Sequence, residues 1–308
     1  AEKIAGVEQS ENSFKAVAFE WLAKQKMNWS ESHFIRVQRI LVNELFPLLG
    51  NRPVASITSK DVLTALRKVE SRGAFDTTHR VKQIAGQVFR YAVATGRAEH
   101  DPTSALKGAL TTPTKKHLAA ITDPKEVGRL LIMLDGYVGT FTVRNALQLA
   151  PLVFARPAEL RHAEPKEIHL DKAEWHIPGK KMKMAHPHIV PLSTQAVEIL
   201  TEQLSLTGQG RYVFPSARSK DRPMSENAIL AAMRAMGIAK EEMTGHGFRA
   251  MARTILDEVL GFRVDLIEHQ LAHAVTDVNG RAYNRTTHLL KRKEMMQKWA
   301  DYLDELKQ

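Results

Sequence analysis

The spacing of apolar residues changes along this chain, and that change constrains the fold most. Over most of the sequence, apolar residues recur every three or four positions, which is typical of one face of an α-helix. Between residues 165 and 192 short, partly alternating runs replace this pattern, and a Lys-rich segment, GKKMKMA, separates the last two. Alternation is typical of strands. The sequence therefore predicts a mainly α protein with a small three-stranded antiparallel β-sheet, an α+β class.

A stretch of low periodicity divides the chain near residue 110. Residues 107–122 (KGALTTPTKKHLAAIT) combine Gly, Pro, Thr and Lys, a composition typical of a linker. We therefore expect a helical domain over 1–108, a linker over 109–122 and a second domain over 123–308. At about 150 residues per domain, 308 residues also suggest two domains.

The first domain is predicted to hold about four helices and no strand. Its second helix is expected to end before Pro47, and Thr58 is a predicted N-cap. In the second domain Asp123 is the predicted cap of a helix whose first residue is Pro124. Further helices are expected at about 139–153, 194–205, 225–236, 248–260 and 263–270. A last helix carries Met296, Trp299 and Leu303; packing in the core and docking onto a neighbouring protomer explain this stripe equally well.

The charge of the chain points to a polyanionic partner. Lys and Arg number 44 against 34 Asp and Glu, giving a net charge of +10, and the excess is +5 on each side of residue 110. Nucleic acid leads the candidate partners, although an indifferent basic surface fits the charge equally well. No Cys is present, which excludes disulfides, Cys-ligated zinc and a Cys nucleophile. No apolar run or visible leader suggests a membrane or secretion, so we expect a cytoplasmic protein.

Several residues could carry chemistry, but each alone is weak. His246 and Arg249 in TGHGFRAM lie three apart at a predicted helix start, where backbone N–H groups and a guanidinium favour a phosphate. Arg156 in FARPAEL could equally form a surface ion pair with Glu159. Lys183 in the predicted strand connection could be merely solvated. His273 in LAH and Tyr283 in AYNR complete the set.

The order of these residues resembles the tyrosine recombinase family. RPAEL is similar to the family's R-x-x-E-L segment, LAH to L-G-H, and YNR to Y-x-R, with a hairpin Lys and H-x-x-R between them. The wording of KMKMAHPHIVPLS, GHGFRAMA and IEHQLAHAV looks closest to the branch of phage and genomic-island integrases similar to that of phage P4. The resemblance runs from about residue 120 to the end, and more loosely covers the first part as a core-binding domain.

The resemblance implies a fold and an activity. The two domains would form a C-shaped clamp on DNA, and the enzyme would cut and rejoin strands through a 3′-phosphotyrosine, integrating or excising a prophage or genomic island. It implies no cofactor and no metal. The implied partners are double-stranded DNA at attachment sites, further copies forming a tetramer, and accessory DNA-bending or excision proteins.

The resemblance also assigns roles. Tyr283 is the expected nucleophile, and Arg156 and Arg249 are expected to hold the phosphate. His246 would accept a proton and His273 would bond the phosphate. Lys183 is the expected acid, with Lys181 as the alternative. Glu159 would support the site rather than react.

Two departures from the family pattern stand out. Ala272 replaces a Gly common in the third motif, which we expect to be harmless. Members of this branch also carry an arm-site-binding domain before the core-binding domain, and no such segment is visible in AEKIAGVEQSENS. We therefore expect this chain to be a fragment of a longer protein.

Other functions remain open at this stage. A type IB topoisomerase shares the catalytic group, a non-catalytic DNA-binding protein could use the same cations, and a nuclease would need an acidic cluster that does not stand out. A metal site is disfavoured because the sheet histidines lack i, i+4 pairs and nearby acidic partners. These histidines are His162, His169, His176, His186 and His188, of which the last two could shape the hairpin near DNA. DNA contact and a solvated face fit Lys82, Arg90 and Arg97 equally well.

Overall fold

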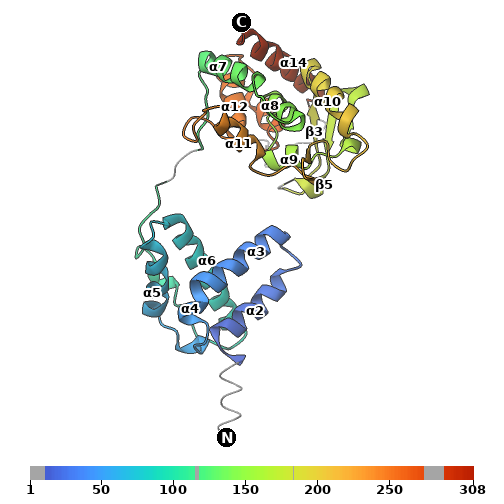
Figure 1. Ribbon diagram of the computed structural model, residues 1–308. Coiled ribbons are helices and arrows are strands. Elements are labelled where there is room, and N and C mark those ends of the chain that lie inside the picture. The colour runs from blue at the N-terminus through green and yellow to red at the C-terminus, as the bar shows by residue number, and fades with distance from the viewer. Residues whose placement is uncertain (1–10, 115–117, 183, 274–287) are drawn as a thin grey trace. The chain divides into compact units, whose positions relative to one another are not determined.

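The computed structural model describes residues 11–114, 118–182, 184–273 and 288–308. The chain divides into two compact units, Ala1–Lys116 and His117–Gln308, which are coloured from blue to red in Figure 1. No helix in these described ranges is long and apolar enough to cross a bilayer.

The N-terminal unit is helical. Its elements are α2 (Phe14–Gln25), α3 (Glu31–Ile40), α4 (Phe46–Leu49), α5 (Ser59–Glu70) and α6 (Phe75–Ala94). The helices enclose a core in which the rings of Phe14 and Phe89 lie 5.2 Å apart. Thr58 caps α5 as predicted, because its hydroxyl accepts from Asp61 N while the Asp61 carboxylate accepts from Thr58 N.

The second helix ends before Pro47 as predicted, because α3 stops at Ile40 and a π-helical turn over Leu41–Leu45 leads into the separate short helix α4. Pro47 lies in the first turn of α4, where the helix makes no use of a backbone N–H and the ring causes no clash.

The C-terminal unit places helices around a small sheet. Its helices are α7 (Pro124–Asp135), α8 (Phe141–Val153), α9 (Pro157–Arg161), α10 (Thr194–Thr207), α11 (Ala228–Ala235), α12 (Gly247–Glu258), α13 (Val264–Gln270) and α14 (Leu289–Glu305). Asp123 caps α7 by accepting from the Lys125 and Glu126 N–H groups. The strands β1 (Ile168–His169), β2 (Glu174–Ile177) and β3 (His188–Pro191) pair antiparallel in that order. The mainly α class with a small antiparallel sheet is thereby confirmed.

A second sheet was not predicted. The strands β4 (Pro215–Ser216) and β5 (Ser219–Pro223) form a short antiparallel hairpin with an irregular register. Its sequence shows no apolar alternation, because every residue of β5 is polar or proline, so the usual signal for a strand is missing.

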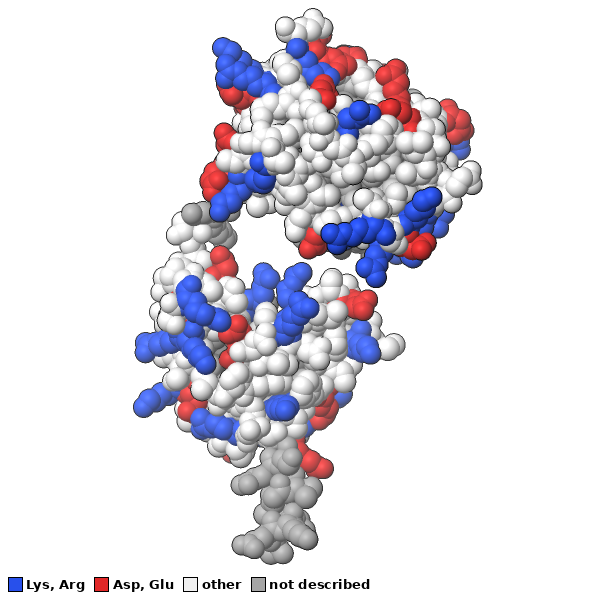
Figure 2. Space-filling model, viewed as in Figure 1, with Lys and Arg blue, Asp and Glu red and all other residues white. Residues whose placement is uncertain are grey.

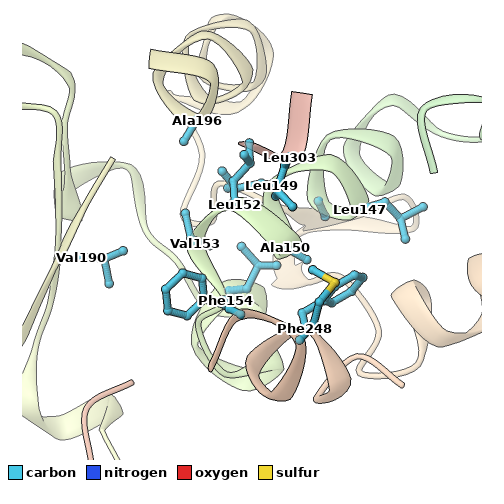
Figure 3. Close-up of a cluster of buried hydrophobic side chains, with 14 of the residues drawn as sticks. Leu147, Leu149, Ala150, Leu152, Val153, Phe154, Val190, Ala196, Phe248 and Leu303 are labelled. Atoms are coloured by element: carbon cyan, nitrogen blue, oxygen red, sulfur yellow. The ribbon is translucent and has the colours of Figure 1, made fainter. Parts of the chain in front are cut away.

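The core of this unit is built around α8. Figure 3 shows Leu147, Leu149 and Phe154 from α8 and its end lying among side chains of α10, α12 and α14. The indole of Trp299 on α14 donates to the Pro151 carbonyl at 2.9 Å, and its ring meets Phe154 edge to face. The apolar stripe of the last helix is therefore packed in the core of its own unit.

Candidate active site

Arg156 begins α9 and is held there by Glu159. The Glu159 carboxylate accepts from the Arg156 backbone N–H at 2.9 Å and from its guanidinium at 2.7 Å. Glu159 is only 5% exposed, whereas Arg156 keeps a fifth of its side chain accessible. Pro157 at the first helical position fixes the turn that follows the Arg. Glu159 therefore orients Arg156 through this ion pair, which is the supporting role expected for Glu159.

Arg249 reaches the same region from α12. Arg249 is only 5% exposed, and its guanidinium donates to the carbonyls of Phe154 and Leu271, at 2.9 and 2.6 Å. No carboxylate in the described ranges forms an ion pair with it. A buried guanidinium bonded to neutral carbonyls leaves a local positive charge that attracts an anion.

Phe154 supplies one of those carbonyls through an unusual backbone. Its φ is +34°, in the left-handed region that bulky L-residues avoid. This conformation ends α8 abruptly, and the buried ring held against Trp299 anchors it. Backbone strain of this kind persists only where the surroundings impose it, and here it lies two residues before Arg156.

His273 is positioned by the way α13 ends. The His273 N–H donates to the Glu268 carbonyl and the Ala272 N–H to the His269 carbonyl, the bond pair of a Schellman motif. Ala272 takes the left-handed conformation that this motif requires, with φ at +50°. The glycine common in the family at this position is therefore explained, and the Ala carries strain of about 1–2 kcal/mol rather than being neutral.

Glu268 orients the His273 ring, and sequence inspection missed it. A guanidinium only donates, so His273 Nε2 accepts from Arg249 at 3.2 Å and the ring proton of the neutral form lies on Nδ1. Nδ1 then donates to the Glu268 carboxylate at 2.5 Å. The other Glu268 oxygen accepts from Arg253 at 3.2 Å. Its place in IEHQLAH, five residues before His273, was the available signal.

His246 immediately precedes α12, in the N-cap position. The Thr244 hydroxyl accepts from the Gly247 N–H at 3.0 Å and donates to the Ala119 carbonyl. Gly247 is needed because a Cβ there would lie 2.6 Å from the Ala119 oxygen. Thus the chain segment before α7 packs against the turn that carries His246.

The electrostatics of the site favour a neutral His246. Burial lowers its pKa, and the charges of Arg249, Arg156 and His273 lower it further, although Glu159 acts in the opposite direction. Burial and Arg156 also lower the pKa of Arg249 to about 10, which leaves it charged at neutral pH. The structure therefore brings together four of the predicted site residues, Arg156, His246, Arg249 and His273, in a positive environment.

The alternative acid, Lys181, is engaged elsewhere. Its ammonium contacts the carboxylates of Glu164 at 2.9 Å and Glu167 at 2.5 Å, and donates to the His162 carbonyl at 2.7 Å. Its side chain is 15% exposed. These three acceptors match the three N–H donors of a Lys. Lys183 and Tyr283, the remaining predicted catalytic residues, lie outside the described residues.

The sheet histidines make local contacts. The His169 and His176 ring centres lie 4.3 Å apart with the rings tilted by 50°. His176 Nε2 lies 2.8 Å from the Glu174 carboxylate, so the expectation that no acidic partner lies nearby in sequence was wrong. In the described ranges no three His, Asp or Glu side chains are grouped as metal ligands would be. His188 is partly buried and donates from Nε2 to the Gln270 carbonyl at 3.1 Å.

The three cations considered as DNA contacts lie in the N-terminal unit and have internal partners. Lys82 donates to the Leu106 carbonyl, Arg90 pairs with Asp101 and Arg97 pairs with Glu20. Figure 2 shows that Lys and Arg side chains are nevertheless spread over both units, as their equal net charges predicted.

Comparisons with known proteins agree on one family. Residues 14–109 match the model of the phage integrase central domain, and residues 121–288 match that of the phage integrase family. The chain is 38% identical to the integrase of Enterobacteria phage P4, over 96% of this chain and 71% of that one. It is 36% identical to the prophage integrase IntZ of Escherichia coli K12, over 95% and 71% of the two chains.

Solved structures share the fold at low sequence identity. A lambda integrase tetramer bound to a Holliday junction aligns with a TM-score of 0.68 and 16% identity, over 89% of this chain and 82% of that one. A lambda integrase dimer bound to a core site gives a TM-score of 0.65 at 18% identity, over 92% of this chain and 83% of that one.

Proposed function

The chain belongs to the phage integrase family, as a site-specific DNA recombinase of the P4 and prophage branch, and on that premise we propose that it works through a covalent 3′-phosphotyrosine. The proposal rests on one observation above all: the convergence of Arg156, Arg249, His246 and His273 around a positive, half-buried site. A phosphodiester is the anion that this chemistry suits, because guanidinium forks match its nonbridging oxygens.

In the first step the Tyr283 hydroxyl attacks the phosphorus. The Tyr oxygen–phosphorus bond forms as the bond from phosphorus to the 5′-oxygen breaks. Neutral His246 takes the phenolic proton. Its lowered pKa supports that role, because it keeps the imidazole unprotonated at neutral pH. Lys183 gives a proton to the departing 5′-oxygen. A 5′-hydroxyl of another strand reverses the step, so the bond energy is retained in the linkage.

The arginines stabilise the charge that gathers on the phosphate. Three of the five Arg249 N–H donors bond within the described part of the chain, which leaves two for the nonbridging oxygens. Removing one preorganised donor of this kind typically costs about 10²–10³ in rate. Glu268, which accepts from Nδ1, holds the His273 ring beside Arg249, where it would lie close to the bound phosphate.

We further propose that the protein acts on double-stranded attachment sites as a tetramer in the bacterial cytoplasm, with help from accessory DNA-bending or excision proteins. The solved lambda integrase tetramer on a Holliday junction supports the assembly by its shared fold. Integrases as relatives favour recombination over the topoisomerase, non-catalytic and nuclease alternatives.

The test uses a nicked duplex that carries the attachment site and traps the covalent step. The wild-type protein should form a denaturation-resistant adduct, and Tyr283→Phe should form none while still binding the duplex. Tyr302→Phe, a matched change on α14, should form the adduct normally. An adduct with Tyr283→Phe would contradict the proposed nucleophile.

A further inference from the structure

The β4–β5 hairpin carries charge that the proposed chemistry does not use. Arg218, Lys220 and Arg222 are exposed on this nine-residue ribbon, and Arg211 is exposed just before it. Asp221 is the one acidic residue from 211 to 223. Figure 2 shows blue side chains gathered where Figure 1 places β5.

These cations differ from the other arginines of the same unit. In its described residues, every other Arg donates a hydrogen bond to an oxygen of the protein or, for Arg144, forms an ion pair with a carboxylate. Those arginines are Arg129, Arg144, Arg156, Arg161, Arg234, Arg249, Arg253, Arg263 and Arg292. Within the same ranges the side chains of Arg218, Lys220 and Arg222 have no such partner, and Arg211 only lies against the Tyr212 ring. Their charge is therefore available to an external anion.

The hairpin is fixed to the element that carries Arg156. Phe214 and Met224, on either side of it, are buried, and the Met224 N–H donates to the Phe214 carbonyl at 2.8 Å. The Val213 N–H donates to the carbonyl of Ala163, just after α9. A hollow of about 350 Å³ lined by Met224, Pro157 and His246 connects the hairpin base with the active site.

We propose that the β4–β5 hairpin binds the DNA phosphate backbone beside the phosphodiester that is cut. This inference rests on the proposed function, which places a phosphate at Arg156 and Arg249. Duplex DNA carries one charge per about 1.7 Å of its axis, so a duplex held there presents further phosphates to neighbouring cations. A two-stranded ribbon is also narrow enough to follow a groove. Because the hairpin base is packed next to α9, the phosphate contacts would keep a fixed position relative to the phosphodiester that is cut.

The salt dependence of binding tests this contact. Each phosphate contact contributes about 0.9 to the slope of log affinity against log salt. The triple variant R218A/K220A/R222A should reduce this slope by about 2–3 on an attachment-site duplex. The control K125A/R129A/K298A removes the same charge from α7 and α14, which Figure 1 shows away from β5, and should keep the wild-type slope. R218K/R222K, which preserves the charge, should keep it too.

Two outcomes would overturn the inference. A wild-type slope in R218A/K220A/R222A excludes a phosphate contact by the hairpin. If R218A/K220A/R222A keeps the wild-type slope of log affinity against log salt but loses association between copies, the hairpin binds an acidic surface of another copy and not DNA. The covalent adduct, measured on the same duplex with saturating protein, reports separately on the proposed function: its absence from the wild-type protein contradicts that function, whatever the slopes show.

Discussion

At the scale of single residues, we propose different roles for Lys181 and Lys183. The three N–H donors of Lys181 are taken up by Glu164, Glu167 and the His162 carbonyl. Hydrogen bonds from Lys166 and Lys181 lower the pKa of Glu164 to about 2. An ammonium held this way neutralises two carboxylates. We infer that Lys181 fastens the connection to the segment after α9, which leaves Lys183 as the acid.

Substitution of each lysine should separate these roles. Lys183→Ala should slow formation of the covalent adduct by about 10²–10⁴ while DNA binding persists. A substrate with sulfur at the bridging 5′ position should restore the rate, because a thiolate leaves without a proton. Lys181→Ala should instead lower the free energy of unfolding by roughly 3 kcal/mol, since it strands two carboxylates. If Lys181→Ala is the variant that sulfur rescues, the assignment is reversed.

His188 makes stability depend on pH. Burial, with the charges of Arg292, Arg249 and Arg156, lowers its pKa from 6.5 to about 3, although its bond to the Gln270 carbonyl acts the other way. The folded protein therefore binds fewer protons than the unfolded chain between these values. The stability contribution is complete above pH 6.5 and is lost as the pH falls toward 3, at up to about 1.4 kcal/mol per pH unit.

Urea unfolding at a series of pH values measures this effect. His188→Gln should flatten the decline in the free energy of unfolding between pH 6.5 and 3, because the amide does not titrate. Equal slopes for His188→Gln and the wild-type protein would show that His188 does not titrate as its burial predicts.

At the scale of elements, α14 is part of the core. Trp299 is fully buried between Pro151 and Phe154, the residue whose left-handed backbone supplies a carbonyl to Arg249. Trp299→Ala should therefore cost about 3–5 kcal/mol in thermal or urea unfolding. Leu290→Ala, which removes an exposed side chain from the same helix, should stay within about 0.5 kcal/mol. Undiminished stability with lost self-association would show instead that the indole serves a neighbouring protomer.

Helix spacing and caps predicted most elements, because these signals are local. The Asp123 cap, the Thr58 cap and the three-stranded sheet all follow from residues close together in sequence. The β4–β5 hairpin escaped prediction because its residues are polar and its stability comes from Phe214 and Met224 at its base. The left-handed Phe154 likewise depends on distant packing.

The site was predictable from the order of its motifs, but not its supporting contacts. Arg156, Arg249, His246 and His273 meet although more than a hundred residues separate the first from the last. Glu268 was not singled out, because its role depends on the end of α13 folding back on itself. The replacement of Gly by Ala272 was expected to be harmless, because the positive φ of this residue depends on how α13 ends.

At the scale of the whole molecule, positive charge is divided between two compact units. Each side of residue 110 carries a net +5, and the N-terminal cations Lys82, Arg90 and Arg97 also stabilise their own unit. Among the described residues of the C-terminal unit, the arginines without an oxygen partner are Arg218 and Arg222 on the β4–β5 hairpin and Arg211 just before it. We propose that recombination by this protein combines a general attraction of both units to DNA with one phosphate site at Arg156 and Arg249.

The measurement that tests the central claim most directly is the position of the covalent link. Adduct formed on a nicked duplex is digested with nuclease and trypsin, and the remaining peptide is identified by mass spectrometry. Trypsin cuts after Arg281 and Arg285, so we expect a nucleotide joined through its 3′-phosphate to the peptide AYNR, at Tyr283. A nucleotide on any other residue, or a link through a 5′-phosphate, would contradict the account.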